Sequence, residues 1–232
     1  MELERWLEID KELLLAFNGS GSVFVDEFAL TVTNGFTWLP LYIILLYLVI
    51  KNNEKLAQIL LIVISVGFCV LLSGGVSDII VKPYLARLRP VADPELKGMV
   101  EIIKGYVPNN FSFFSSHAAN TASVAVFFCL LVKNRLFSLF MLGWSLINCW
   151  SRLYLAVHYP SDIIVGLLYG IIIGVIVYLS YMRLYTKISP KLHYISSQYT
   201  KTGYSLPDID YVLNIIAFIM IYVIIKSVIT AL

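Results

Sequence analysis

The sequence predicts an all-α integral membrane protein: a bundle of six transmembrane helices, preceded by an amphipathic helix at the membrane interface. Of its 232 residues, 59% are hydrophobic and only 14% are charged, and the mean hydropathy is +0.82. Soluble domains are about half apolar and about one quarter charged, so a soluble core could not bury this much apolar surface. Apolar runs of about 18 residues or more are long enough to cross a hydrocarbon layer of about 30 Å. We therefore expect one membrane domain, residues 1–232.

The first element, within residues 1–20, is the predicted interfacial helix. Its hydrophobic residues recur at near-helical spacing, with most of the charged residues between them. The recurring residues are Leu3, Trp6, Leu7, Leu13, Leu14 and Phe17. Asn18 and the glycines at 19 and 21 then end the helix. The segment is acidic, unlike the basic start of a cleaved signal peptide, so we expect it to remain on the mature protein.

Six apolar runs follow, and short polar connections separate most of them. The predicted spans are residues 28–50, 56–81, 117–131, 136–157, 163–185 and 211–232. The longest polar segment of the chain lies between the second and third spans, at residues 82–116. Six crossings place this segment, residues 151–162 and both termini on the same side of the membrane.

Charge excludes one class of function and says little about orientation. A net charge of +2, without a basic run interleaved with aromatic residues, argues against nucleic-acid binding. Lysines and arginines are nearly balanced between the two sides of the membrane, so their count alone does not orient the protein. If Lys82, Arg89 and Arg152 are reserved for a binding site, the remaining positive charge favours an outward-facing site.

Two cations and a proline end the second span. Lys82 and Arg89 lie seven residues apart, and Pro90 follows directly. Such a pair could have no role beyond placing its charged ends at the membrane–water interface, with the aliphatic parts of the side chains in the bilayer. The pair alone therefore leaves structural and functional interpretations open.

The third span begins with a second group of polar residues, Ser115, Ser116 and His117. Serine before an apolar run is typical of a helix N-cap, and a helix N-terminus offers free N–H groups and a positive dipole end to a phosphate. His117, on the first turn, would meet that phosphate. A serine cap beside a chance histidine is the plainer interpretation of this segment taken alone.

The connection between the fourth and fifth spans carries Arg152, His158 and Asp162. The planar guanidinium of arginine forms two parallel hydrogen bonds to a phosphate. A histidine becomes a usable nucleophile when a carboxylate holds its other ring nitrogen, and Asp162 could do this for His158. Two of the three histidines thus fall in polar segments on one membrane face, where ionisable residues are costly and indicate function. The third, His193, is interpreted as a solvated loop residue.

Together these three segments resemble the signature of the type 2 phosphatidic acid phosphatase family. The matching pattern is Lys82-x6-Arg89-Pro90, then Ser115-Ser116-His117, then Ser151-Arg152-x5-His158-x3-Asp162. The spans that carry it run from about residue 56 to 185. The resemblance implies that Lys82, Arg89 and Arg152 hold the phosphate oxygens, together with Ser115 and the amide of Ser116. It further implies that His158 attacks phosphorus, that Asp162 orients it, that His117 protonates the leaving oxygen, and that no metal or cofactor takes part.

The middle segment departs from the family pattern, which usually has Pro-Ser-Gly-His where this chain has Phe114-Ser115-Ser116-His117. Glycine permits positive φ and a close backbone approach to an anion, which serine does less readily. The amide contact from Ser116 is therefore the weakest of the implied phosphate contacts. The neighbouring Phe113 and Phe114 could anchor the loop at the interface.

The predicted function is removal of phosphate from a membrane lipid in the bacterial inner membrane, with the site facing the periplasm. A site at headgroup level suits a substrate whose tail stays in the bilayer. Among the family's substrates, undecaprenyl diphosphate is favoured, followed by lipid A phosphate; phosphatidylglycerol phosphate is a further candidate. Two alternatives remain: a phosphotransferase that passes the same phosphohistidine to a lipid acceptor, and a transporter with a polar path. The sequence does not indicate an oligomeric state.

Overall fold

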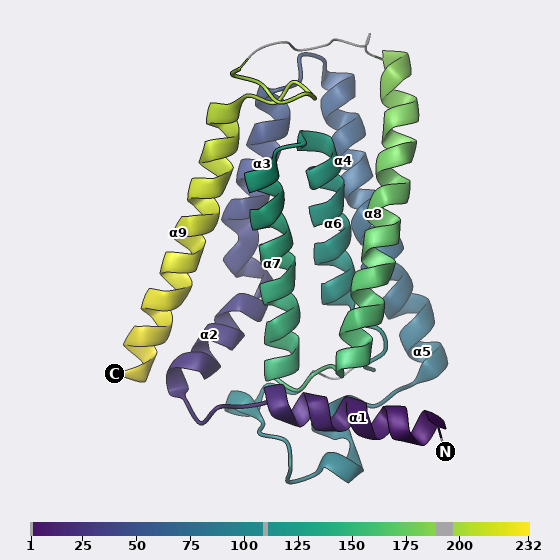
Figure 1. Cartoon of the computed structure of the whole chain (residues 1–232), viewed down its shortest axis with the longest axis vertical. Coiled ribbons are helices and arrows are strands. Elements are labelled where there is room, and N and C mark those ends of the chain that lie inside the picture. The colour runs from purple at the N-terminus through teal and green to yellow at the C-terminus, as the bar shows by residue number, and fades with distance from the viewer. Residues whose placement is uncertain (1, 109–110, 189–196) are drawn as a thin grey trace.

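The computed structural model describes residues 2–108, 111–188 and 197–232, and no strand occurs in these ranges. Its long helices form an upright bundle, with α6 in the interior (Figure 1). The helices are α1 Glu2–Phe17, α2 Val23–Thr33, α3 Leu39–Lys51, α4 Leu56–Val70, α5 Lys82–Leu85, α6 Ser116–Val132, α7 Arg135–Tyr154, α8 Pro160–Ile188 and α9 Leu206–Ala231. His193 lies outside the described residues.

One end of the bundle gathers the elements that the sequence placed together. The purple helix α1 lies across this end of the bundle, and both termini are found there (Figure 1). The polar segment after α5 folds beneath it through three short 3₁₀ turns, Pro90–Ala92, Pro94–Leu96 and Ile103–Gly105. A helix at the N-terminus is therefore present, whereas its position at a membrane interface stays a prediction.

The first predicted span, 28–50, is not one straight helix. It consists of α2 and α3, which meet at an angle of 68°. Asn34 has an extended backbone there, and its side chain accepts a hydrogen bond from the amide of Phe36 at 3.0 Å. Trp38 Nε1 donates to the carbonyl of Val32 at 2.8 Å, which satisfies a carbonyl that the broken helix leaves free. Local polar bonds thus stabilise the bend inside an otherwise apolar run.

The second predicted span, 56–81, consists of α4 followed by two π-helical segments, Leu71–Gly75 and Ser77–Val81. The last four predicted spans overlap α6, α7, α8 and α9, but the count of six crossings stays a prediction. Within the described residues, three segments are long and apolar enough to cross a membrane, or four if the bent pair is one span: Leu56–Leu96, Pro160–Ile188, Leu206–Ala231, and Val23–Thr33 with Gly35–Lys51. Helix α6 is a shorter apolar helix. It is enclosed by α4, α7 and α8 and is mostly buried, so protein rather than lipid surrounds much of it.

A row of glycines holds α6 and α8 together. Gly166, Gly170 and Gly174 recur every fourth residue on the face of α8 that meets α6. A Cβ at Gly170 would lie only 2.4 Å from the carbonyl oxygen of Ala119, so the two backbones are in direct contact. Small residues at this spacing allow close helix packing in membranes. We call this contact the glycine seam. It places the N-termini of α6 and α8 side by side, with the amide of Ser115 donating to the carbonyl of Asp162 at 3.1 Å.

Candidate active site

His158 lies in the short connection between α7 and α8, and its side chain is only 1% exposed. Its two ring nitrogens face opposite surroundings. Nδ1 lies 3.5 Å from Asp162 Oδ2 and 3.4 Å from Ser112 Oγ, whereas Nε2 lies 3.2 Å from Arg89 Nη1. Because oxygen acceptors face Nδ1, we place the proton of the neutral ring there, which leaves the lone pair on Nε2.

The electrostatic surroundings favour the neutral form of His158. Burial is the main cause that lowers its pKa well below the usual 6.5, and the positive charges of Arg152 and Arg89 lower it further. Lys82 and His117 act in the same direction. A neutral imidazole with a free Nε2 lone pair is the form that can attack phosphorus.

Asp162, on the first turn of α8, is completely buried and fully hydrogen-bonded. Its Oδ2 accepts the amide of Tyr159 at 2.9 Å and the hydroxyl of Ser112, while its Oδ1 accepts Arg87 Nη1 at 2.7 Å. An ionised carboxylate can remain in such a site only if it is paired in this way. These bonds fix the carboxylate that faces His158.

The predicted phosphate-binding arginines come from separate elements and are both buried. Arg89, just before the 3₁₀ turn Pro90–Ala92, donates from Nη1 to the carbonyl of Val157 at 2.6 Å. Arg152, on the last turn of α7, donates from Nη1 to Thr33 Oγ1 at 2.6 Å and to the hydroxyl of Tyr106 at 3.1 Å. Within the described residues, Nε of Arg152 is buried without a hydrogen-bond partner. That unused donor is available to an anion.

Lys82 and Ser116 meet in a small polar cluster. Lys82 Nζ donates to Asp78 Oδ1 at 2.6 Å and to Ser116 Oγ at 2.7 Å, and the Ser116 hydroxyl donates to the same oxygen of Asp78 at 2.6 Å. Positive φ occurs at four described residues other than glycine, and Ser116 is not one of them. The conformational freedom of the family's glycine is therefore not needed here, and the serine hydroxyl adds a contact to Lys82.

The N-terminus of α6 supplies the remaining predicted residues. Ser115 is the N-cap, and its hydroxyl accepts the amide of Ala118 at 3.4 Å. His117, on the first turn, is exposed, in contrast to His158. Phe114 is buried and packs on the ring of Tyr169 at 4.9 Å between centroids, so it anchors the loop inside the bundle and not at its surface.

Sequence reasoning missed several residues that hold this arrangement. Arg87 and Ser112 both bond Asp162, and Asp78 pairs with Lys82. Asp78 could have been found, because it is a carboxylate inside an apolar run, one helical turn before Lys82. Nothing in the spacing of Ser112 or Arg87 indicates their partners, which lie 50 and 75 residues away in the chain.

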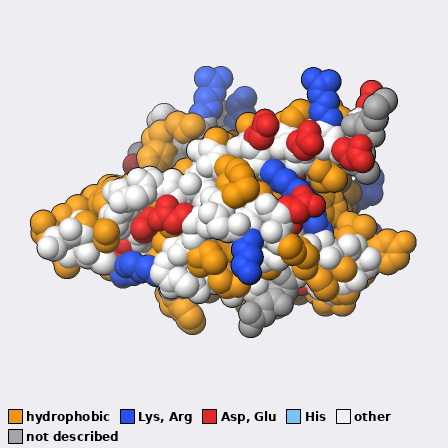
Figure 2. Space-filling model, turned by 90° about the horizontal axis from the view of Figure 1, so that it is seen from below, with side chains coloured by type: hydrophobic (Ala, Val, Ile, Leu, Met, Phe, Trp, Pro, Cys, Tyr) orange, Lys and Arg blue, Asp and Glu red, His pale blue; other side chains and the backbone are white. Residues whose placement is uncertain are grey.

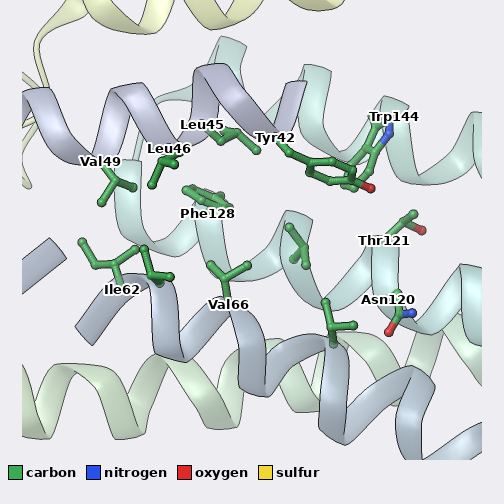
Figure 3. Close-up of a pocket in the computed structure, with 13 residues that line it drawn as sticks. Tyr42, Leu45, Leu46, Val49, Ile62, Val66, Asn120, Thr121, Phe128 and Trp144 are labelled. Atoms are coloured by element: carbon green, nitrogen blue, oxygen red, sulfur yellow. The ribbon is translucent and has the colours of Figure 1, made fainter. Parts of the chain in front are cut away.

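An apolar groove of about 390 Å³ opens between α3, α4 and α6 (Figure 3). Most of its wall is aliphatic or aromatic: Leu45, Val49, Ile62, Val66 and Phe128 are among the lining residues. Asn120 and Thr121 form its polar end, one helical turn beyond His117 on α6. The groove therefore begins near the first turns of α6, next to the candidate site, and continues between apolar side chains toward Val49 and Ile62.

The chain is similar to a known protein family and to two characterised enzymes. The PAP2 superfamily matches residues 58–185, which is more than half of the chain. A lipid A 4'-phosphatase from Bacteroides thetaiotaomicron is 36% identical over 166 residues, 70% of this chain and 72% of that protein. A lipid A 4'-phosphatase from Porphyromonas gingivalis is 32% identical over 183 residues, 78% of this chain and 76% of that protein.

Among solved structures, the fold is similar to the crystal structure of a transmembrane PAP2-type phosphatidylglycerolphosphate phosphatase from Bacillus subtilis. The TM-score is 0.55, and the match covers 82% of this chain and 90% of that one. At 19% identity, this similarity concerns the fold alone.

Proposed function

The chain belongs to the PAP2 superfamily and is a membrane-embedded lipid phosphate phosphatase; from this premise we propose that it hydrolyses its substrate through a phosphohistidine on His158. The observation that carries the proposal is the position of His158 between Asp162 on Nδ1 and Arg89 beside Nε2. This arrangement orients a nucleophile and supplies a cation next to the atom that it attacks.

The reaction has two steps. Nε2 of His158 forms a bond to phosphorus, and the bond from phosphorus to the lipid oxygen breaks as His117 donates a proton to that oxygen. His117 then removes a proton from water, whose oxygen attacks the phosphohistidine and releases inorganic phosphate and neutral His158. Arg89, Arg152 and Lys82 neutralise the equatorial oxygens, since phosphoryl transfer depends chiefly on positioning and charge.

We further propose that the substrate is a lipid A, dephosphorylated at its 4' position. The two curated relatives support this choice over undecaprenyl diphosphate, which the sequence alone placed first. The groove along α6 supports a lipid substrate of either kind, because a hydrocarbon chain lying in it would hold the headgroup phosphate near His117. We place the protein in the bacterial cytoplasmic membrane, with the site facing the periplasm.

The test is phosphate release by the purified protein in detergent and EDTA. The substrates are lipid A, undecaprenyl diphosphate, phosphatidylglycerol phosphate and phosphatidic acid, and mass spectrometry of the lipid A product identifies which phosphate is lost. Loss of the 4' phosphate, abolished in His158→Ala and retained in the control His193→Ala, is the expected result. Retained turnover in His158→Ala would rule out the nucleophile. Release from undecaprenyl diphosphate alone would rule out lipid A, and transfer to a second lipid without free phosphate would indicate a phosphotransferase.

A further inference from the structure

We propose that Arg87 and Asp10 are positioning residues for Asp162, so that the N-terminal helix α1 helps to orient the catalytic carboxylate. The inference rests on the proposed role of His158 as nucleophile. The guanidinium of Arg87 joins two carboxylates: Nη1 donates to Asp162 Oδ1 at 2.7 Å, and Nη2 donates to Asp10 Oδ2 at 2.7 Å. It also lies over the ring of Tyr159, with 3.9 Å from Cζ to the centroid.

These contacts constrain the carboxylate of Asp162. Arg87 holds Oδ1, so the other oxygen, Oδ2, is the one turned toward His158. The planar fork of arginine fixes direction as well as charge, which a lysine cannot do. Without Arg87, a completely buried carboxylate would lose its cation, and its orientation toward His158 would depend on Ser112 and the amide of Tyr159 alone.

Asp10 ties this arrangement to α1. It is buried, which is unusual for a carboxylate on an amphipathic helix. Its Oδ1 accepts the amide of Ser161 at 2.8 Å, and its Oδ2 accepts the hydroxyl of the same residue. The carboxylate therefore binds the N-terminus of α8, where free N–H groups and the helix dipole favour a negative charge. Asp10 thus holds Arg87 from one side and the first turn of α8, which carries Asp162, from the other.

The two faces of α1 have different surroundings. Asp10 and Leu14 face the protein and are buried, whereas Trp6, Leu13 and Phe17 are exposed. Seen from below, this end of the molecule mixes acidic, basic and hydrophobic side chains (Figure 2). The inner face of α1 thus contacts the site, and its outer apolar face is free to contact lipid.

The chain offers a matched control for these contacts. Lys11, next to Asp10, forms an ion pair with Glu95 in the polar segment. That pair also joins α1 to the active-site end, but the side chain of Glu95 is 75% exposed. Lys11→Gln therefore removes a charged contact of α1 without touching Asp162.

The experiment measures kcat and KM for lipid A, and unfolding in detergent, in Arg87→Ala, Asp10→Asn, the double variant and Lys11→Gln. Loss of a residue that orients a metal ligand costs about 10- to 100-fold in activity, and we expect the same range for a residue that orients Asp162. We expect kcat to fall by about that range in Arg87→Ala and by about tenfold in Asp10→Asn, with KM nearly unchanged. Lys11→Gln should stay within about twofold of the wild type, and methylguanidinium should restore part of the activity of Arg87→Ala. Asp10→Asn, which is isosteric, keeps the test valid if Arg87→Ala fails to fold.

A second readout does not depend on the lipid chosen. Orthovanadate mimics the transition state of phosphoryl transfer, so its affinity, measured by calorimetry, reports how well His158 is held. Arg87→Ala should weaken vanadate by about 10-fold or more and inorganic phosphate by much less. Equal vanadate affinity in Arg87→Ala and Lys11→Gln would overturn the inference. A change in KM without a change in kcat in Arg87→Ala or Asp10→Asn would also overturn it, as would a double variant whose loss of kcat is the product of the two single losses. The two proposals can fail separately. If the wild-type protein releases no phosphate from any lipid but Arg87→Ala still binds vanadate more weakly than wild type, the proposed function is wrong and the positioning role is supported.

Discussion

Helix α8 is held in place by opposite means at its N-terminal end and along its middle. At the N-terminal end, buried charges and hydroxyls bond one another around Asp162. Along the glycine seam, backbone meets backbone, and a Cβ at Gly166 or Gly170 would collide with a carbonyl of α6. Buried charges cost desolvation and are weak evidence for stability, whereas close packing is a direct source of it. We therefore expect substitutions at the polar end to change turnover, and substitutions in the seam to change stability.

The largest expected effect is on turnover, in Asp162→Asn. The amide keeps the shape of the carboxylate but removes the charge that stabilises a positively charged His158, and it can present the wrong partner to Nδ1. In the comparable serine protease triad, this change lowers kcat by about 10⁴-fold, or about 5.5 kcal/mol. Phosphate release and the unfolding midpoint should be measured together. A variant that keeps more than about a tenth of wild-type kcat would contradict the role of Asp162.

The seam should show the reverse pattern in Gly170→Ala. The added Cβ would lie 2.4 Å from the carbonyl oxygen of Ala119 and 2.9 Å from the Cβ of Ala122, so the helices must separate. Overpacking of this kind costs about 1–3 kcal/mol. Gly143→Ala is the matched control, because a Cβ at Gly143 meets nothing within 4 Å. Alanine there should be neutral or stabilise α7 by up to about 1 kcal/mol. Equal unfolding midpoints in detergent for the two variants would show that the seam does not carry stability.

These two regions differ in how far the sequence predicts them. The motif residues at the polar end were predicted from their chemistry together with the family resemblance: Lys82, Arg89, Arg152, His158 and Asp162 are all buried there. Their neighbours were not, because a contact such as Asp10 to Arg87 joins residues 77 apart and leaves no local pattern. The glycine seam has a local pattern, spacing by four, which hydropathy alone does not register.

The bend at Asn34 was missed for a related reason. Hydropathy averages over a window and carries no direction, so residues 28–50 predict one straight helix. Polar residues inside the run, Thr31 among them, were the available signal: Thr37 Oγ1 donates to the carbonyl of Thr31 at 2.6 Å, next to the break. The bend matters for the site, since Thr33, the last residue of α2, accepts the bond from Arg152.

A smaller effect is expected at the opposite end of the bundle, in Asn134→Ala. Asn134 caps α7, and its side chain accepts the amide of Phe137 at 2.9 Å. Loss of an N-cap costs about 1 kcal/mol. The unfolding midpoint should fall while kcat per folded molecule stays at the wild-type value. A loss of kcat without a loss of stability in Asn134→Ala would contradict the expectation that only the polar end around Asp162 controls turnover.

The smallest effect should be that of moderate acidification on His158. Its pKa lies well below 6.5 because of burial and the charges of Arg152 and Arg89, with Lys82 and His117 adding to them. A group with a lowered pKa stays neutral as the pH falls to 6.5, so the nucleophile remains available over the range from pH 7.5 to 6.5. An ordinary histidine would lose about half of its neutral form over the same range.

The profile of kcat/KM against pH reports the free enzyme, but a substrate phosphate with a second pKa of about 6 titrates in the same range. Comparing wild type with Arg152→Gln removes that contribution, because the substrate is the same for both. Removing the positive charge should raise the pKa of His158 in the variant, so its kcat/KM should fall more steeply toward acid than that of the wild type. Parallel profiles, or a wild-type profile that falls more steeply, would contradict the role of Arg152 in lowering the pKa of His158.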